Sequence, residues 1–260
     1  MAKYPSVDLT YLVKLIADLR GPNGCPWDKQ QTHESLKRYL LEESYEVLDS
    51  IDQNKKGLAE ELGDILLQVL FHSQIASEEG TFAIDDVLAT LGRKLIERHP
   101  HVFGKGVVRD TVEVEARWEQ IKQEGKSDKK DFSIFNSIPS AMPALAYGQL
   151  MQERASRNGF DWDEIDGVLD KVGEEIHEIK EAKSEQEKKA EFGDLLFSLV
   201  NVSRWMGIQA EDSMRQANSR FKNRFSRMKE LAKDKGASFS DLQQVEKDAL
   251  WEQAKILERS

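Results

Sequence analysis

Cysteine is almost absent from this sequence: Cys25 is the only one in 260 residues, so no disulfide can form within the chain. Long hydrophobic runs are absent too, since the longest apolar stretches, at residues 65–71 and 195–200, are far too short to span a bilayer. The first residues lack the basic segment and apolar core of a signal peptide. These absences predict a cytoplasmic protein with no membrane partner.

An excess of positive charge is also missing. The chain has 37 lysines and arginines against 47 aspartates and glutamates, a formal net charge of -10. Binding to a polymeric nucleic acid requires a basic surface, so this balance argues against such a partner. A small polyanion such as a nucleotide stays compatible with an acidic chain when metal ions mask the local charge.

The sequence contains an internal repeat, in which four short segments recur in the same order about 130 residues later. The segments that begin at Asn23, Glu42, Glu61 and Trp118 match those that begin at Asn158, Glu174, Glu191 and Trp251. We interpret this as a tandem duplication. It predicts an N-terminal helical module over residues 1–123, a linker over 124–140 and a C-terminal module over 141–260.

Apolar residues recur with the period of an α-helix in both copies. The first predicted stripes are Leu36, Leu40, Val47 and Ile51, then Leu58, Leu62, Ile65, Leu66 and Val69, and the second are Val168, Val172, Ile179 and Ala182, then Phe192, Leu195, Leu199 and Val202. Short breaks at Gly57 and Ser184 make the helices of each pair antiparallel neighbours. The predicted fold is therefore all-α, a tandem repeat of two helical modules with about four or five helices each, packed as bundles.

Acidic residues interrupt these stripes at matching places. Glu43 stands where a leucine is expected, and Glu46 follows at a spacing that shares its helix face. Glu61 and Asp64 show the same spacing on the next predicted helix, so antiparallel packing directs four carboxylates to one point. The second copy repeats the pattern with Glu175, Glu178, Glu191 and Asp194.

Four converging carboxylates repel one another unless a cation neutralises them. An all-oxygen ligand set predicts Mg²⁺, with Mn²⁺ as a substitute. A solvated acidic surface is the simple alternative, which recurrence in both copies disfavours, although a duplication also copies inert features. A di-iron site is disfavoured because only the second copy has the Glu-x-x-His spacing, at Glu174 and His177.

Basic and aromatic residues, most of which follow the acidic pairs, are predicted to hold the phosphates and base of a nucleotide. Basic residues four apart on a helix grip phosphate oxygens, and a tryptophan offers a stacking face. The predicted substrate-binding residues are Lys94, Arg98, Trp118 and Lys122 in the first copy, and Lys189, Arg220, Arg224, Trp251 and Lys255 in the second. Solvent exposure or core packing are the alternative roles. A P-loop is rejected, since no glycine and no strand precede Gly125-Lys126-Ser127 at the required place.

The doubled acidic signature resembles the MazG family of the all-α nucleoside triphosphate pyrophosphohydrolase superfamily. That signature, Glu-Glu-x-x-Glu followed after a spacer by Glu-x-x-Asp, occurs from Glu42 to Asp64 and again from Glu174 to Asp194. Residues 24–28 and 98–104 also resemble MazG, and the similarity covers nearly the whole chain.

The resemblance implies Mg²⁺-dependent hydrolysis of nucleoside triphosphates (NTPs and dNTPs) to monophosphate and pyrophosphate. It also implies broad base specificity, a four-helix-bundle core in each of the two modules, and a homodimer. It also implies that the C-terminal copy is the main catalyst. The copies are expected to differ, because Ile165-Asp166-Gly167 replaces Thr32-His33-Glu34 and the second spacer is two residues shorter. The predicted catalytic glutamates, one of which orients the attacking water, are Glu174, Glu175, Glu42 and Glu43.

Two other functions stay open at this point. A related pyrophosphohydrolase acting on phosphoribosyl-ATP or on one specific dNTP would use a similar cluster of acids. A non-catalytic helical interaction module would carry the same acids merely as a charged surface.

Overall fold

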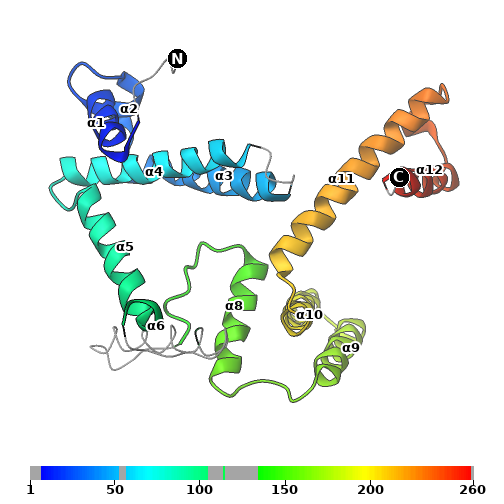
Figure 1. Cartoon of the computed structure of the whole chain (residues 1–260). Helices are drawn as coiled ribbons and strands as arrows, with labels where there is room; N and C mark the ends of the chain where they lie inside the picture. The colour runs from blue at the N-terminus through cyan, green and yellow to red at the C-terminus, as the bar shows by residue number, and fades with distance from the viewer. Residues whose placement is uncertain (1–6, 53–56, 105–113, 115–133, 259–260) are drawn as a thin grey trace. The chain divides into compact units, whose positions relative to one another are not determined.

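The computed structural model describes residues 7–52, 57–104, 114 and 134–258. Within these ranges the regular elements are all helices and no strand is present, which confirms the all-α prediction (Figure 1). The chain divides into two compact units, Met1–Asp128 and Lys129–Ser260. No described helix is both long enough and apolar enough to cross a membrane.

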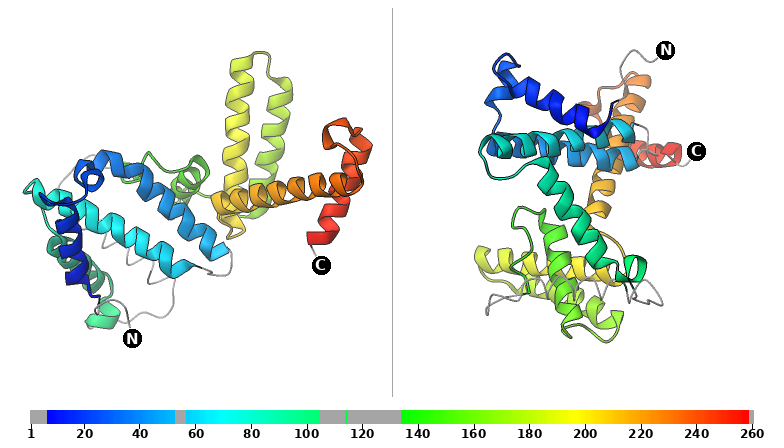
Figure 2. Two further views of the ribbon diagram at one scale, coloured as in Figure 1. Left: turned by 90° about the horizontal axis from the view of Figure 1, so that it is seen from above. Right: turned by 60° about the vertical axis from the view of Figure 1, so that its left-hand side comes forward.

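The first unit is organised around an antiparallel helical hairpin. Its described helices are α1 (Leu9–Arg20), α2 (Pro26–Gln30), α3 (His33–Asp52), α4 (Leu58–Glu78), α5 (Ile84–Arg98) and α6 (Pro100–Phe103). Helices α3 and α4 lie side by side and form the hairpin, while α1 packs across the C-terminal half of α4 (Figure 2). The hairpin therefore meets the rest of the unit at the end remote from its turn.

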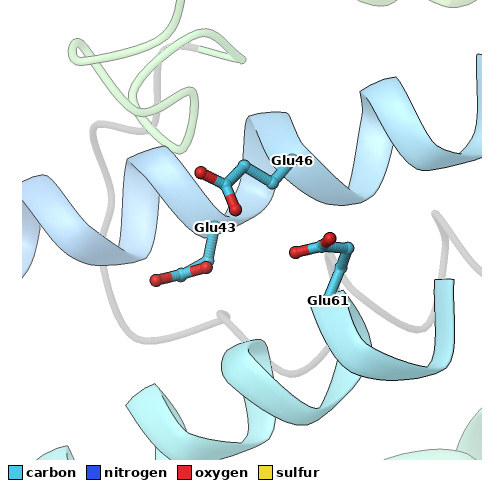
Figure 3. Close-up of side chains that lie close together, drawn as sticks. All are labelled: Glu43, Glu46 and Glu61. Carbon is cyan, nitrogen blue, oxygen red and sulfur yellow. The ribbon is translucent and has the colours of Figure 1, made fainter. Parts of the chain in front are cut away.

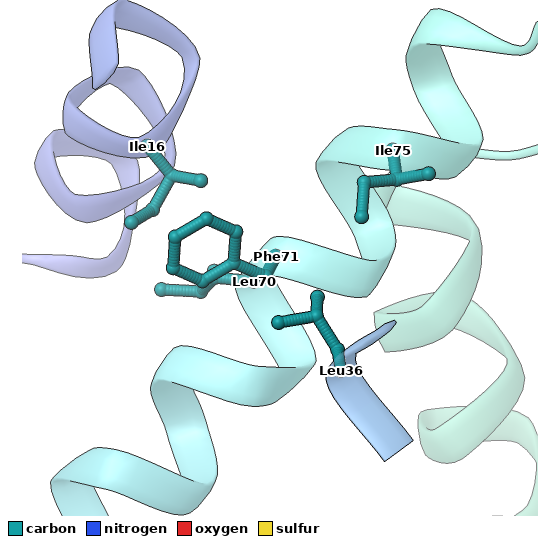
Figure 4. Packing of buried hydrophobic residues seen from close by; sticks show 5 residues of the cluster. All are labelled: Ile16, Leu36, Leu70, Phe71 and Ile75. Carbon is teal, nitrogen blue, oxygen red and sulfur yellow. The ribbon is translucent and has the colours of Figure 1, made fainter. Parts of the chain in front are cut away.

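The core of the first unit lies where α1, α3 and α4 meet. Phe71 of α4 lies between Ile16 of α1 and Leu36 of α3, with Leu70 and Ile75 beside it (Figure 4). These side chains are at most 4% exposed, and burying one of them stabilises the fold by about 1.5–3 kcal/mol. The core therefore fixes the register of α3 against α4.

A buried arginine side chain links the end of α1 to the end of α4. Arg20, the last residue of α1, donates to both carboxylate oxygens of Glu78 at 3.0 and 2.7 Å. Arg20 also donates to two backbone carbonyl oxygens, those of Asp28 and Gln31. Gly24 allows the intervening turn, since a Cβ there would lie 2.1 Å from the carbonyl oxygen of Leu19.

The second unit also contains an antiparallel hairpin. Its described elements are α8 (Ala144–Arg157), α9 (Ile165–Glu181), α10 (Glu185–Trp205), α11 (Ala210–Asp234), the 3₁₀ turn η1 (Phe239–Asp241) and α12 (Gln244–Glu258). Helices α9 and α10 form the hairpin, α8 packs against α10, and α12 packs against α11. The left view of Figure 2 shows α9 and α10 side by side along their length.

Buried polar side chains join the helices of the second unit. Gln149 of α8 donates to the carbonyl oxygen of Ile208 and accepts from the backbone N–H of Ala210, which fixes the turn between α10 and α11. Gln152, one turn later, donates to the carbonyl oxygen of Phe197 at 2.8 Å. These bonds position α10, which carries part of the acidic site described below.

An ion pair anchors the segment between α8 and α9. Both oxygens of Asp161 accept from the Arg204 guanidinium, at 2.9 and 2.5 Å, and the carboxylate also accepts from Trp205 Nε1 and Ser156 Oγ. The hydrogen bonds from Arg204 are the main reason why the pKa of Asp161 lies far below its ordinary value. Arg204 lies near the end of α10, so the segment is fixed to the hairpin.

The predicted apolar stripes are only partly buried within one chain. Leu36 and Val168 are each 1% exposed, as expected for core positions. By contrast, Leu40, Leu62 and Phe192 are 39%, 51% and 56% exposed. Each hairpin thus keeps an apolar surface that the described part of its own chain does not cover.

Candidate metal centre

Three carboxylates converge between the helices of the first hairpin. Glu43 and Glu46 extend from α3 and Glu61 extends from α4 into the space between them (Figure 3). One oxygen from each lies within 4.8 Å of the others. We call this group the first acidic triad; three oxygen ligands at this separation are suited to one hard divalent cation.

The local sequence explains why these side chains meet. Glu43 and Glu46 are three residues apart, so they share one face of α3. Gly57 precedes α4 with a φ of 84°, a left-handed conformation that favours glycine and lets the chain reverse. Glu61 then lies in the first turn of α4, opposite the glutamates of α3.

No lysine or arginine of the described residues forms an ion pair with the first acidic triad. Burial raises the pKa of Glu43 most, and repulsion from Asp64 and Glu46 raises it further. The pKa of Glu61 is raised by burial and then by Glu46. Glu43 and Glu61 therefore resist ionisation beside their acidic neighbours, and a bound cation would reverse this effect.

The second hairpin holds an equivalent group, the second acidic triad. Glu175 and Glu178 of α9 and Glu191 of α10 bring oxygens within 4.8 Å of one another. Burial, followed by repulsion from Glu175 and Glu191, raises the pKa of Glu178. The same physical arrangement thus occurs once in each unit.

Glu175 distinguishes the second acidic triad, because it is the most deeply buried of these acids at 2% exposed. Its Oε1 accepts from the Lys171 ammonium at 2.8 Å. Its Oε2 is buried and has no hydrogen-bond partner within the described structure. Burying a carboxylate oxygen without a hydrogen-bond donor costs free energy. A bound divalent cation would remove this cost, so Oε2 of Glu175 is suited to be a metal ligand.

The remaining predicted acids lie around the two triads. Asp64 is half-buried and close enough to Glu43 to raise its pKa, whereas Asp194 is exposed. Neither aspartate belongs to the groups of three that converge within the described residues. Glu42 and Glu174 are exposed, and Glu174 accepts from Lys171 at 2.9 Å. The ligand role of the aspartates and the catalytic role of these glutamates stay predictions.

The predicted substrate-binding residues of the second copy gather mainly on α11 and α12. The Arg224 guanidinium lies over the Trp251 ring, 5.4 Å from its centroid, and pairs with Glu258 at 2.6 Å. Lys255 pairs with Glu252, one turn away. The other predicted cations, which are exposed or half-buried, are Arg220 on α11, Lys189 on α10, and Lys94 and Arg98 on α5.

Trp118 and Lys122 lie outside the described residues. The sequence paired Trp251 with Lys255, whereas the cation that the structure places over the Trp251 ring is Arg224. The tryptophan also packs with Phe221, at 5.6 Å between centroids, so its ring is partly engaged within the protein. Substrate binding by this set stays a prediction.

Two features of the hairpins were not singled out from the sequence. Lys171 precedes Glu174 and Glu175 by three and four residues, and that spacing was an available signal. His33 and His72 join α3 to α4 through a 2.7 Å contact between their Nδ1 atoms. Burial and then His33 lower the pKa of His72. His33 and His72 are 39 residues apart, so no short-range sequence pattern predicts their contact.

Comparison with known proteins supplies the family. Residues 31–103, which contain α3 to α6, match the model of the MazG nucleotide pyrophosphohydrolase domain. The nucleoside triphosphate pyrophosphohydrolase/pyrophosphatase MazG of Thermotoga maritima is 47% identical over 245 residues, which are 94% of either chain. The chain belongs to the MazG family. The nucleoside triphosphate pyrophosphohydrolase of Escherichia coli K12 is 41% identical over 94% of this chain and 95% of its own.

The match to MazG relatives extends well beyond the domain model. A 46% identical protein of Bacillus subtilis, YabN, matches 94% of this chain but only 51% of its own length. The first acidic triad of this MazG chain lies within residues 31–103, and the second lies outside them. Both triads therefore need to be considered as candidate metal centres.

Proposed function

We propose that this MazG chain hydrolyses nucleoside triphosphates, both NTPs and dNTPs, to the monophosphate and pyrophosphate in a Mg²⁺-dependent reaction. The observation that carries the proposal is the buried, unpartnered Oε2 of Glu175 beside Glu178 and Glu191. The names of the relatives from Thermotoga maritima and Escherichia coli support the same activity.

The site residues have separate tasks in this proposal. Glu175, Glu178 and Glu191 would hold the divalent ion, with Asp194 as a further ligand, and Glu43, Glu46, Glu61 and Asp64 would do so in the first unit. When bound, the ion polarises the phosphate chain and lowers the pKa of a water molecule. Mn²⁺ is the expected substitute, because it shares the preference for oxygen ligands.

Glu174 is the proposed general base of the second unit. Its carboxylate is exposed, so it can reach a water molecule, and Lys171 holds one of its oxygens at 2.9 Å. Glu42 has the matching place in the first unit. The cations of α11 and α12, with Arg224 beside the Trp251 ring, would neutralise phosphate charge and place the base. Stacking on an indole ring tolerates every base, which supports broad specificity.

We further propose that the chain is a cytoplasmic homodimer with one helical module in each unit. The exposed apolar residues of the first hairpin support the dimer, because two helices alone leave them uncovered. The largest of them are Leu40, Leu41, Tyr45, Leu48, Ile51, Leu62, Leu66 and Val69. A second hairpin laid on this surface would complete four-helix packing. Sedimentation of the chain should give twice its 29.7 kDa mass.

Product analysis tests the proposed reaction. The chain is incubated with ATP, the other NTPs and the dNTPs, with and without Mg²⁺, and the products are separated by chromatography. Monophosphate and pyrophosphate in equal amounts, only with Mg²⁺, are expected. Diphosphate and inorganic phosphate would contradict the bond assignment. No turnover and no binding of Mg²⁺ would favour a non-catalytic interaction module.

A further inference from the structure

Lys171 gives the second acidic triad an internal positive charge. Its Nζ lies 2.8 Å from Oε1 of Glu175 and 2.9 Å from Oε1 of Glu174. The Glu175 side chain is 3% exposed, whereas that of Lys171 is 35% exposed. The lysine therefore reaches from the surface to a carboxylate that solvent cannot neutralise.

Glu175 is neutralised from one side only. The ammonium contacts Oε1, while Oε2 is buried without a partner and belongs to the carboxylate that converges with Glu178 and Glu191. A divalent ion bound by this triad would lie close to the ammonium. Like charges at this separation repel, so the lysine and the ion compete for the same carboxylate.

The first acidic triad lacks this arrangement. When the sequences of the two Glu-Glu-x-x-Glu segments are aligned, Tyr39 stands at the position of Lys171. The Tyr39 ring packs edge-on against Trp27, 5.8 Å between centroids. Among the described residues, no lysine or arginine forms an ion pair with Glu43, Glu46 or Glu61. The two triads therefore have similar ligands but different local charge.

We propose that Lys171 is a tethered counter-cation of the second acidic triad, which holds Glu175 in place before metal binds and must give way when a divalent ion enters. This inference rests on the proposed metal-dependent function. Lys171 is a positioning residue, since it acts through Glu175. The lysine therefore lowers the metal affinity of the second acidic triad: the three carboxylates bind a divalent ion more weakly than they would without Lys171.

Direct metal titration tests the inference without measuring turnover. The full chain carries Glu43→Gln and Glu46→Gln to silence the first triad, and Mn²⁺ is titrated by calorimetry in the absence of nucleotide. Lys171→Met keeps the length of the apolar stem but removes the charge. It is expected to bind Mn²⁺ roughly tenfold more tightly, because the positive charge beside Glu175 is removed and no longer repels the incoming cation.

Two matched controls separate charge from shape and from net charge. Lys171→Arg keeps the cation and should preserve the affinity of the parent chain. Lys37→Met removes a lysine that forms a similar exposed pair with Glu34 in α3 and should also leave the Mn²⁺ affinity unchanged. Circular dichroism and the unfolding midpoint show whether each variant is folded.

The reciprocal experiment transfers the lysine to the first triad. In a chain with Glu175→Gln and Glu178→Gln, Tyr39→Lys should weaken Mn²⁺ binding at Glu43, Glu46 and Glu61. Tyr39→Met is the control, since it loses the ring contact with Trp27 but adds no charge. Weaker binding in Tyr39→Lys than in Tyr39→Met is the expected result.

The outcomes distinguish the inference from the proposed function. Unchanged or weaker Mn²⁺ binding in Lys171→Met overturns the counter-cation role, and weaker binding would mean that the lysine supports the ligands. If the parent chain with an intact second triad binds no Mn²⁺ at all, the proposed metal-dependent function itself fails for that unit, whatever Lys171 does.

Discussion

The two hairpins carry the same acids at matching positions, yet they stabilise them in different ways. In α9 and α10, Glu175 is almost fully buried and paired with Lys171. In α3 and α4, Glu43 is only half-buried, and its pKa is raised by burial first and then by repulsion from the surrounding acids. The comparison teaches that the duplicated segments kept the ligand geometry while the charges around it diverged.

Each unit also contains a tie, an arginine–carboxylate pair that links the hairpin to an earlier part of the unit, and the two ties differ in which side supplies the arginine. In the first unit the arginine is Arg20 on α1 and the acid is Glu78 at the end of α4. In the second unit the arginine is Arg204 near the end of α10, and the acid is Asp161 after α8. The connection is retained while donor and acceptor have exchanged places. The fixed feature is thus the tie itself, which holds the hairpin in position.

The largest expected effect comes from removing one ligand charge in each triad. Glu175→Gln preserves side-chain size and should lower Mg²⁺-dependent pyrophosphate release by about a hundredfold or more, because a metal ligand is lost. Glu43→Gln should lower it by less than about tenfold, since the first triad has no equally buried ligand. Steady-state pyrophosphate assays at saturating Mg²⁺ compare them. A larger loss in Glu43→Gln would reverse the assignment of the main site.

The second largest effect concerns the arginine ties. Arg20→Met should destabilise the chain by about 3 kcal/mol, because the 6%-exposed arginine side chain makes four hydrogen bonds that are all lost. Among the described residues, Glu78 then keeps only the donor Gln74, and the Gln31 carbonyl loses the arginine that donates to it. Arg204→Met should cost about 2 kcal/mol, since Trp205 and Ser156 still donate to Asp161.

Denaturant unfolding measures both changes. Arg227→Met is the control for a surface ion pair, because Arg227 and Glu230 are 50% and 61% exposed, and its expected cost is below about 1 kcal/mol. Losses for Arg20→Met and Arg204→Met no larger than that of the control would show that the ties are unimportant for stability.

Much of the fold was accessible from the sequence because its information is local. The stripe around Leu36 and the break at Gly57 predicted the hairpin, and the spacing of Glu43 and Glu46 placed two acids on one face. The ties were not accessible, since Asp161 and Arg204 are 43 residues apart and share no periodic signal. The exposure of Leu40 and Leu62 could not be predicted either, because periodicity shows that a face is apolar but not what covers it.

A smaller effect is the loss of stability from each of these two arginine–carboxylate pairs as the pH is lowered. The Arg204 hydrogen bonds hold the folded-state pKa of Asp161 below its unfolded value. Such a group stabilises the fold fully above the unfolded value, near 3.9, and the contribution is lost as the pH falls through the folded value. The stability gap between the wild type and Asp161→Asn should therefore be about 2 kcal/mol at pH 7 and narrow below about pH 4.

Glu78 allows the same measurement in the first unit. Its pKa is lowered chiefly by the hydrogen bond from Arg20, so the gap between wild type and Glu78→Gln should also narrow in acid. Unfolding free energies between pH 7 and pH 3 give both curves. A gap that stays constant over this range would mean that neutral hydrogen bonds, rather than the carboxylate charge, hold the tie.

The smallest expected effects lie at the turns of the two hairpins, which start their second helices by different means. Ser184 caps α10 by accepting from the backbone N–H of Glu187, whereas α4 follows Gly57, which has no side chain with which to cap the helix. Ser184→Ala should cost about 1 kcal/mol by leaving that N–H without its acceptor. Gly57→Ala should cost about 1–2 kcal/mol through its positive φ alone, because the added Cβ would lie 3.8 Å from its nearest neighbour, Glu61 Oε1. Denaturant unfolding measures the cost of both substitutions. Gly57→Asn should be more stable than Gly57→Ala, because asparagine tolerates the left-handed region better. An asparagine variant no more stable than the alanine variant would contradict the backbone explanation.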